Sequence, residues 1–270
     1  MTGTSSVLVQ KTIITLINPL LIKISIITAV YNNCANIGPC IDSVLSQSYP
    51  NIEHIVVDGQ STDGTIDIIR SYENKIGKWA SEKDTSIYDA LNKGIAMSTG
   101  DVIGFLHSDD VFNNATMIEK IATLFSRTNS DAVFGDLVYV SKTNIANIVR
   151  YWKSNEFNVT KFRHGWMPPH PTLFLTKKVY DSYGLFNLKY RISSDYDLML
   201  RTLGSGNLHC EYLPEIITRM RVGGASNKSL KNIWIKSYED WQALKQNKIG
   251  GCYTLFLKNV SKLGQFLRKS

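Results

Sequence analysis

Strand and helix patterns alternate through the first part of this chain, and this alternation restricts the fold more than any other feature. Hydrophobic strands are predicted over residues 23–28, 54–57 and 102–106, with a short one at Trp79. Helices are predicted over residues 66–72 and 87–97, and an earlier one after Asn36, a candidate N-cap. Strands separated by helices of this length favour an open, mainly parallel α/β sheet flanked by helices.

Acidic residues follow three of these strands. Asp58 ends the second strand, Asp84 follows the third, and the adjacent pair Asp109 and Asp110 follows the fourth. In open α/β sheets, ligands bind at the carboxyl ends of the strands, so these carboxylates are expected along one edge. Two simpler explanations for the pair are an acidic turn and the N-cap of the next helix.

Carboxylates gathered at one crevice need a partner that is cationic or rich in hydrogen-bond donors. A nucleotide with a divalent metal meets both needs, because hard cations such as Mg²⁺ or Mn²⁺ take oxygen ligands from carboxylates and phosphates. No GxGxxG segment follows the first strand and no GxxxxGK[ST] motif is present. Dinucleotide-binding and P-loop sites therefore lack their required element.

The net charge of +7 is concentrated at the end of the chain. Residues 228–270 hold nine lysines and arginines against Glu239 and Asp240, whereas residues 1–227 hold 21 charges of each sign. In a helix built from this tail, apolar residues fall on one face and lysines on the other: Tyr253, Phe256, Leu257, Val260, Leu263 and Leu267 against Lys258, Lys262 and Lys269. Such a helix suits an anionic membrane surface.

A helix that packs on its own domain with a solvated lysine face would give the same tail pattern, and the sequence leaves both explanations open. Nucleic acid is not an expected partner, since no reading motif accompanies the basic charge. The apolar stretch at residues 13–22 is interrupted by Pro19 and has no cleavage site, so neither a signal peptide nor a membrane span is predicted. Four dispersed cysteines predict free thiols in a reducing compartment, the cytoplasm.

Four ordered segments resemble a known family. They are residues 25–32 (SIITAVYN), 43–50 (SVLSQSYP), 57–65 (VDGQSTDGT) and 106–110 (LHSDD). Together they closely resemble the family 2 inverting glycosyltransferases of the GT-A fold, over roughly residues 22–225. The resemblance implies a nucleotide-sugar donor, a Mn²⁺ or Mg²⁺ ion, and transfer to an acceptor hydroxyl with inversion at the anomeric carbon.

The resemblance also implies roles for individual donor-site residues. Ala29 and Tyr31 would border the base, Asp58 and Asp84 would hold the base and ribose, Asp110 would bind the metal, and Asp109 would reach the ribose or donor sugar. Tyr31 could instead be a packed aromatic residue. The chain departs from the family at residues 82–86 (EKDTS), where Glu-Pro-Asp-x-Gly is usual, and at His107, where asparagine is common. Both departures touch the donor pocket.

On the acceptor side, the resemblance identifies Asp195 as the base that takes the proton from the acceptor hydroxyl. Asp195 lies in residues 191–198 (RISSDYDL), where Ser194 replaces the usual glutamate and leaves Asp197 as a second candidate. The alternative for Asp195 is a first-turn aspartate that stabilises a helix dipole.

Two later segments complete the implied site. His170, in residues 169–172 (PHPT), would lie near the diphosphate and ligate the metal or donate to phosphate. Arg221, in residues 221–226 (RVGGAS), would meet phosphate from a loop that closes over the donor. A core histidine and an ordinary turn are the corresponding alternatives.

The sequence therefore predicts three parts: a lead-in (1–21), a GT-A domain (22–227) and a basic helical extension (228–270). The expected activity is transfer of a sugar, most simply from a UDP-sugar, to a glycan or lipid-linked acceptor in cell-surface polysaccharide or glycolipid biosynthesis. We expect a cytoplasmic protein, peripheral on the inner membrane face if the tail binds lipid. A sugar-phosphate nucleotidyltransferase and a non-catalytic nucleotide-sugar-binding protein are the alternatives.

Overall fold

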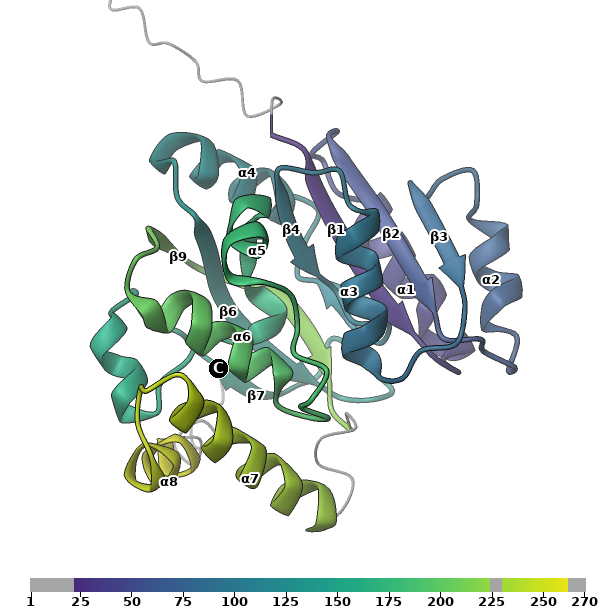
Figure 1. Ribbon diagram of the computed structural model, residues 1–270. Coiled ribbons are helices and arrows are strands. Elements are labelled where there is room, and N and C mark those ends of the chain that lie inside the picture. Colours follow the sequence, from purple (N-terminus) through teal and green to yellow (C-terminus); the bar gives the residue numbers. More distant parts are fainter. Residues whose placement is uncertain (1–21, 224–229, 262–270) are drawn as a thin grey trace, which may run out of the picture.

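The computed structural model of the chain describes residues 22–223 and 230–261 (Figure 1). The predicted lead-in and the last part of the predicted extension lie outside these residues. The strands are β1 (Ile24–Val30), β2 (Ile52–Asp58), β3 (Lys78–Ser81), β4 (Val102–Phe105), β5 (Val111–Phe112), β6 (Ala132–Val140), β7 (Ile148–Trp152), β8 (Phe174–Thr176) and β9 (Cys210–Arg221). The helices are α1 (Cys34–Leu45), α2 (Thr65–Ser71), α3 (Ile87–Met97), α4 (Met117–Thr128), α5 (Lys177–Tyr183), α6 (Ser194–Thr202), α7 (Leu230–Gln246) and α8 (Cys252–Ser261), with short 3₁₀ turns η2 (Val159–His164), η3 (His170–Thr172) and η4 (Leu203–Ser205).

The strands form one sheet in the order β3-β2-β1-β4-β8-β6-β9-β5, with β7 paired to β6. Strands β1 to β4 are mutually parallel, as are β6 and β9, whereas β8 is antiparallel to both β4 and β6 and joins the two halves. This arrangement confirms the predicted open α/β sheet and all four predicted strands. The helix expected over residues 87–97 is α3 with the same bounds.

Both faces of the sheet are covered by helices (Figure 1). Successive side chains of β1 point to opposite faces of the sheet. Ile27 and Ala29 belong to the core with α3, α5 and α6, whereas Ile24 and Ile26 belong to the core with α1 and α4. Because β1 is buried along its whole length, its sequence is mostly apolar, as expected for a central parallel strand. Its two polar residues, Ser25 and Thr28, are hydrogen-bonded to Glu53 and His54 on β2.

One predicted helix start is wrong, and one alternative for the acidic pair is excluded. Helix α1 begins at Cys34 after Asn33, and Asn36 lies inside it, donating its side-chain amide to Asn33 Oδ1 at 2.8 Å. Helix α4 begins at Met117 after Thr116, so the pair Asp109 and Asp110 is not its N-cap. The pair lies instead in the turn between β4 and the short strand β5.

The C-terminal helices α7 and α8 pack on α6 and η2 and contribute to the main core, where Ala243 and Leu244 are fully buried. The approach of α8 is close: Gly165 has a φ of +77°, and a Cβ there would lie 2.3 Å from the backbone nitrogen of Lys258. The described part of the predicted extension is therefore integral to the fold.

The predicted polarity of the tail helix is wrong in α8. Lys258 is buried, 2.8 Å from Asp240 Oδ2, with its ammonium over the ring of Tyr196, whereas Tyr253 and Phe256 are exposed. Helical periodicity assigns a lysine to the solvent side by default, but a carboxylate on α7 and an aromatic ring on α6 supply a partner inside.

The four cysteines are free, as predicted. Within residues 22–223 and 230–261, none of the helices combines the length and the apolar character that crossing a membrane requires.

Candidate active site

The carboxyl ends of β1, β2 and β3 meet at one edge because the register pairs Val30 with Asp58 and Asp58 with Ser81. Asp58 is fully buried there. Its Oδ2 accepts hydrogen bonds from the Ser81 hydroxyl at 2.7 Å and the backbone N–H of Ser61 at 3.1 Å, but its Oδ1 has no partner. A buried carboxylate oxygen without a donor is costly, so this atom is suited to a donor brought by a ligand.

Tyr31 and Asp84 stand on either side of Gly59 at the same edge. A Cβ on Gly59 would lie 3.2 Å from Asp84 Oδ2 and 3.3 Å from Tyr31 Cδ2, so only glycine leaves this gap open. The Tyr31 side chain is 66% exposed, which excludes the packed-aromatic alternative. Asp84 accepts from Lys93 Nζ at 2.8 Å; burial raises the pKa of this carboxyl and the ammonium partly offsets the rise.

Asp110 is the buried member of the acidic pair, and Asp109 is partly exposed. The backbone N–H of Arg221 donates to Asp110 Oδ1 at 3.1 Å, and the Arg221 guanidinium donates to the carbonyl oxygen of Asp109. Burial and the adjacent charge of Asp109 raise the pKa of Asp110 well above its usual range, and the Arg221 contact only partly offsets this. The structure thus brings Arg221, predicted to meet phosphate, to the acidic pair.

Asp110 has the chemistry of a single ligand for a hard cation. Its Oδ2 is buried and unpartnered, and carboxylate oxygen is what Mg²⁺ and Mn²⁺ prefer. Among the residues that the structure describes, no group of three or more His, Cys, Asp or Glu side chains could cage a metal. This suits an ion that is held by one or two side chains and completed by substrate phosphates and water.

His170 and His107 lie between the acidic pair and Asp195. His170 is stacked on Phe105 with ring centroids 5.6 Å apart, and its centroid is 6.2 Å from that of His107. Burial lowers the pKa of His170 to about 4, so the imidazole is neutral at pH 7; the charge of Asp195 acts in the opposite direction. Its Nε2 is buried without a partner, which leaves a lone pair or an N–H for a ligand.

Asp195 is the second residue of α6 and is partly exposed. Its Oδ1 accepts from the Tyr88 hydroxyl at 3.2 Å and from the backbone N–H of Tyr196 at 2.8 Å. Burial and the charge of Asp195 raise the pKa of Tyr88 well above its usual range, so this phenol stays protonated and keeps donating. The charge of Asp195 also acts on the pKa of His107, which places the expected base next to the end of β4.

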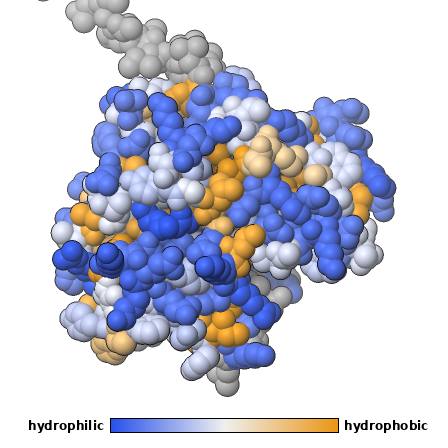
Figure 2. All heavy atoms as spheres, viewed as in Figure 1, coloured by the Kyte–Doolittle hydropathy of each residue, from blue (hydrophilic) through white to orange (hydrophobic). Residues whose placement is uncertain are grey.

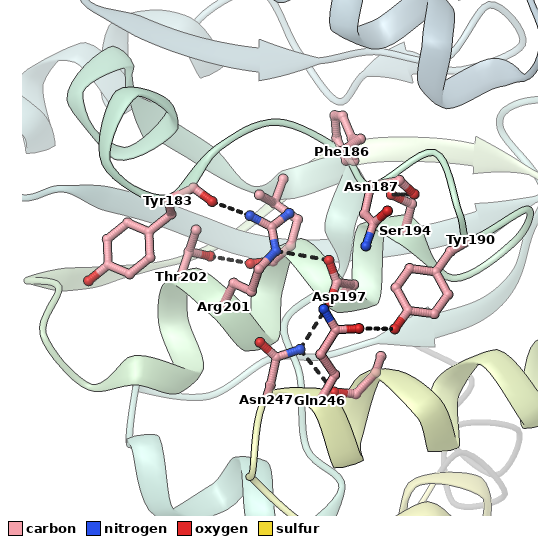
Figure 3. Close-up of polar contacts among 12 residues, drawn as sticks. Tyr183, Phe186, Asn187, Tyr190, Ser194, Asp197, Arg201, Thr202, Gln246 and Asn247 are labelled. Atoms are coloured by element: carbon pink, nitrogen blue, oxygen red, sulfur yellow. Dashed lines mark hydrogen bonds and ion pairs between the residues drawn. The ribbon is translucent and has the colours of Figure 1, made fainter.

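Asp197, the second candidate base, is already occupied. It is fully buried, with Oδ2 bound to Arg201 Nε at 2.9 Å and Oδ1 bound to Asn247 Nδ2 at 3.0 Å (Figure 3). A general base needs an accessible lone pair, and Asp197 offers none to a substrate.

The sequence-based reasoning missed Tyr88 as a contact of the base and His107 as its neighbour. Tyr88 lies in the predicted helix 87–97, directly after residues 82–86 (EKDTS), and His107 lies in residues 106–110 (LHSDD), so their position beside the acidic segments could have identified them. Ala29 is placed at the carboxyl end of β1, but its methyl group belongs to the core. Its role beside the nucleotide base stays a prediction. Residues 224–226 of the predicted closing loop lie outside the described residues.

The open sheet and the acidic edge at the carboxyl ends of its strands define a GT-A glycosyltransferase. Residues 25–182, more than half of the chain, match the sequence model described as Glycosyl transferase family 2, and the chain belongs to this family.

A similar curated protein is the PGL/p-HBAD biosynthesis glycosyltransferase of Mycobacterium tuberculosis, 28% identical over 217 residues, which cover 78% of this chain and 82% of that one. Among solved structures, S. aureus TarS 1-349 in complex with UDP-GlcNAc has a TM-score of 0.67 at 17% identity, covering 83% of this chain and 65% of that one. The mannosyltransferase PcManGT of Pyrobaculum calidifontis, in complex with GDP-Man and Mn²⁺, has a TM-score of 0.62 at 14% identity, covering 92% and 76%.

Proposed function

We propose that the protein is an inverting, divalent-metal-dependent glycosyltransferase that moves a sugar from a nucleoside diphosphate donor to an acceptor hydroxyl. The observation that carries this proposal is a pair of buried carboxyl oxygens without partners, Asp58 Oδ1 and Asp110 Oδ2. Both lie at the carboxyl ends of the parallel strands, and Asp195 is close enough to this edge for its charge to act on His107. One oxygen suits an N–H or O–H of the nucleoside, and the other suits a cation at the diphosphate.

Asp195 performs the proton transfer in this proposal. Its carboxylate takes the proton of the acceptor hydroxyl while the acceptor oxygen forms a bond to the anomeric carbon. The bond from that carbon to the diphosphate oxygen breaks, and its electron pair leaves with the nucleoside diphosphate. Attack opposite the leaving group inverts the anomeric configuration. The Tyr88 hydroxyl, hydrogen-bonded to Asp195 Oδ1, fixes the orientation of the carboxylate.

Asp110 and the neutral His170 are the residues that would hold Mn²⁺ or Mg²⁺. When bound, the ion neutralises the charge that develops on the leaving diphosphate. Arg221 supplies a fixed positive charge beside the same pair of aspartates. Tyr31 and Asp84 border the nucleoside end, and Asp109, partly exposed, reaches toward the ribose or the donor sugar.

UDP is the nucleotide we propose, and the acceptor we propose is a glycan or lipid-linked glycan of the cell surface. Two similar proteins support this choice: TarS has been solved in complex with UDP-GlcNAc, and the mycobacterial relative is a PGL/p-HBAD biosynthesis glycosyltransferase. The GDP-Man complex of PcManGT makes GDP-sugars the second donor to test.

The test is to incubate the protein with UDP- and GDP-sugars, Mn²⁺ or Mg²⁺ and glycan acceptors, and to measure nucleoside diphosphate release and the anomeric configuration of the product. We expect Asp195→Asn to lower turnover by about 10²- to 10⁴-fold, the usual contribution of a general base. Asp197→Asn, two residues along the same helix, is the matched control. Pyrophosphate release would instead indicate a nucleotidyltransferase, and donor binding without turnover would indicate a non-catalytic binding protein.

We further propose that the end of the molecule formed by α7 and α8 binds the cytoplasmic face of an anionic membrane. The two acidic residues of segment 228–270, Glu239 and Asp240, are both buried, so the exposed charged side chains of its described part are lysines. Large aromatic and aliphatic side chains are exposed beside them on α7 and α8, and some orange surface is visible at this end of the molecule, although the hydropathy scale leaves Trp and Tyr pale (Figure 2). These exposed side chains are Ile233, Trp234, Tyr238, Tyr253, Phe256 and Val260.

Deleting residues 228–270 would not test membrane binding, because it would also remove the core residues Ala243 and Leu244. The double variant Trp234→Ser, Phe256→Ser alters only exposed side chains. It should weaken binding to phosphatidylglycerol vesicles in a sedimentation assay, whereas neutral phosphatidylcholine vesicles should bind neither protein. Equal binding of the variant and the parent protein to anionic vesicles would contradict the proposal.

A further inference from the structure

Helix α7 reaches the loop in front of Asp195 through one buried side chain. Glu239 is 7% exposed, and its carboxylate accepts hydrogen bonds from three consecutive backbone N–H groups. The distances are 2.9 Å from Arg191 N to Oε1, 2.8 Å from Ile192 N to Oε2 and 2.9 Å from Ser193 N to Oε2. Three amides that converge on one carboxylate form an anion-binding nest, and charge-assisted bonds of this kind are the strong ones.

The three amides lie directly before α6, so holding them fixes where that helix begins. Ser193 is the N-cap residue and Asp195 follows two positions later. The opposite side of the loop is held as well, because the Tyr88 hydroxyl shares its one proton between the carbonyl oxygen of Ile192 at 2.5 Å and Asp195 Oδ1 at 3.2 Å. The loop is therefore fixed through its N–H groups by α7 and through a carbonyl group by α3.

Other contacts tie the same segment to α7. The Tyr190 hydroxyl donates to Gln246 Oε1 at 3.0 Å, and Asn247 binds Asp197, as the dashed lines in Figure 3 show. These contacts use side chains at the far end of α7, whereas Glu239 binds the three backbone N–H groups just before Asp195, beside a 3.3 Å bond from the Ser193 hydroxyl to the carbonyl oxygen of Lys236. Glu239 is thus the α7 side chain that holds the path of residues 191–193, while Tyr88 holds the same loop from α3.

We propose that Glu239 is a positioning residue for the transfer reaction, holding the 191–193 loop so that Asp195 meets the acceptor hydroxyl. The inference rests on the proposed function, in which Asp195 is the base. Proton transfer requires the base within hydrogen-bond reach of the acceptor hydroxyl, and a displacement of about 1 Å costs on the order of 100-fold in rate. The donor residues Asp58 and Asp110 lie on other elements and do not depend on this loop.

The chain offers a matched control in Glu53 on β2. Glu53 is 6% exposed, and its carboxylate likewise binds a loop, accepting from the backbone N–H of Thr99 at 2.8 Å and from the Ser25 hydroxyl at 2.7 Å. It lies at the amino end of β2, on the edge of the sheet opposite Asp58. Replacing either glutamate removes a buried, hydrogen-bonded charge, but only one of them is next to the base.

The test compares Glu239→Gln with Glu53→Gln. A glutamine at position 239 keeps the shape of the side chain but turns an NH₂ group toward at least one backbone N–H. We expect Glu239→Gln to lower kcat for transfer by about 10- to 100-fold, to leave the donor KM unchanged, and to speed hydrogen exchange at the amides of residues 191–193. Glu53→Gln should lower the melting temperature while leaving kcat and exchange at these amides unchanged.

If Glu239→Gln does not fold, Glu239→Asp keeps the charge and shortens the side chain by one methylene, and the same measurements apply. An unchanged kcat with faster exchange at residues 191–193 would overturn the inference, as would an equal loss of kcat in Glu53→Gln. Full turnover by Asp195→Asn would instead overturn the base assignment. The two failures are therefore distinguishable.

Discussion

Two buried carboxylates at the carboxyl ends of the strands, here called the donor edge, differ from two beneath Asp195 in how completely the protein satisfies them. Asp58 and Asp110 each keep one buried oxygen without a partner. Asp197 and Glu239, equally withdrawn from water, have both oxygens bound by side-chain or backbone donors of the protein. Asp58 and Asp110, which lie at the donor edge, are suited to a ligand, whereas Asp197 and Glu239 hold the structure around Asp195; Asp240 also has one unpartnered oxygen, but its other oxygen is ion-paired with Lys258 inside the fold.

This difference means that burial alone does not identify a functional acid in this molecule. An unpartnered buried oxygen lowers the stability of the free protein and contributes when a ligand supplies the missing contact. A fully bound carboxylate stabilises the free protein and has no capacity left for a ligand. Asp110→Asn and Asp197→Asn test this distinction, and Gly59→Ala tests the gap beside the donor-edge acid Asp84; they are ordered here by their expected effect on kcat/KM.

Asp110→Asn should have the largest effect. Losing a ligand of the metal should lower turnover by about 100-fold or more. The variant should nevertheless melt at a higher temperature than the parent without metal, because it removes the repulsion between Asp110 and Asp109 in a buried site. Steady-state kinetics and thermal unfolding with and without Mn²⁺ measure both effects. Mn²⁺ should raise the melting temperature of the parent protein but not that of Asp110→Asn.

Asp67→Asn is the charge-matched control for this experiment, since Asp67 is 81% exposed in an ion pair with Arg70. It should change neither turnover nor the response to Mn²⁺. If Asp110→Asn is both less stable and fully active, Asp110 has a structural role like that of Asp197 and Glu239. The unpartnered oxygen would then not indicate a ligand site.

Gly59→Ala should have an intermediate effect, confined to donor binding. The added methyl group would press on Asp84 Oδ2 and on the ring of Tyr31, each closer than an ordinary contact. Overpacking of this size costs about 1 kcal/mol, so the donor KM should rise by roughly fivefold or more while kcat is retained. Donor titrations of the two proteins at saturating acceptor decide the point; an unchanged KM would mean that the donor does not use this gap.

Asp197→Asn should leave turnover per folded molecule unchanged. It breaks the contact with Arg201 and should lower the free energy of unfolding by about 3 kcal/mol, since Arg201 loses a fully buried partner. Urea unfolding, alongside Asp67→Asn with its exposed ion pair, measures the loss. A strong fall in kcat without a fall in stability would mean that Asp197 takes part in the chemistry.

The arrangement of the donor edge was largely predictable from the sequence, whereas on the acceptor side the sequence indicated Asp195 but not the contacts that hold it. Asp58, Asp84 and Asp110 each follow a strand with a clear local pattern, and parallel strands bring their carboxyl ends together whatever their separation in the chain. The family resemblance rests on the same local segments. Local sequence patterns do not predict the short strand β5 or the antiparallel strand β8, because both depend on pairing partners that are distant in the chain.

Glu239 and Lys258 show why the rest escaped prediction. Glu239 binds main-chain amides 46 to 48 residues away, and every residue except proline has such an amide, so the side chains near position 191 give no sign of the contact. Lys258 follows the helical pattern of a surface lysine, and only the placement of Asp240 on another helix makes it a buried one. The matched family region also ends at residue 182, before Asp195 and both of these residues.

The use of backbone amides by Glu239 has an evolutionary consequence. The side chains of Arg191, Ile192 and Ser193 can change without any change in the hydrogen bonds that Glu239 receives, provided that none becomes proline. The loop beside Asp195 is therefore free to vary its surface while its path stays fixed. Under the proposed mechanism, a relative that keeps a glutamate at this position on its C-terminal helix can change these side chains without changing how Asp195 is placed.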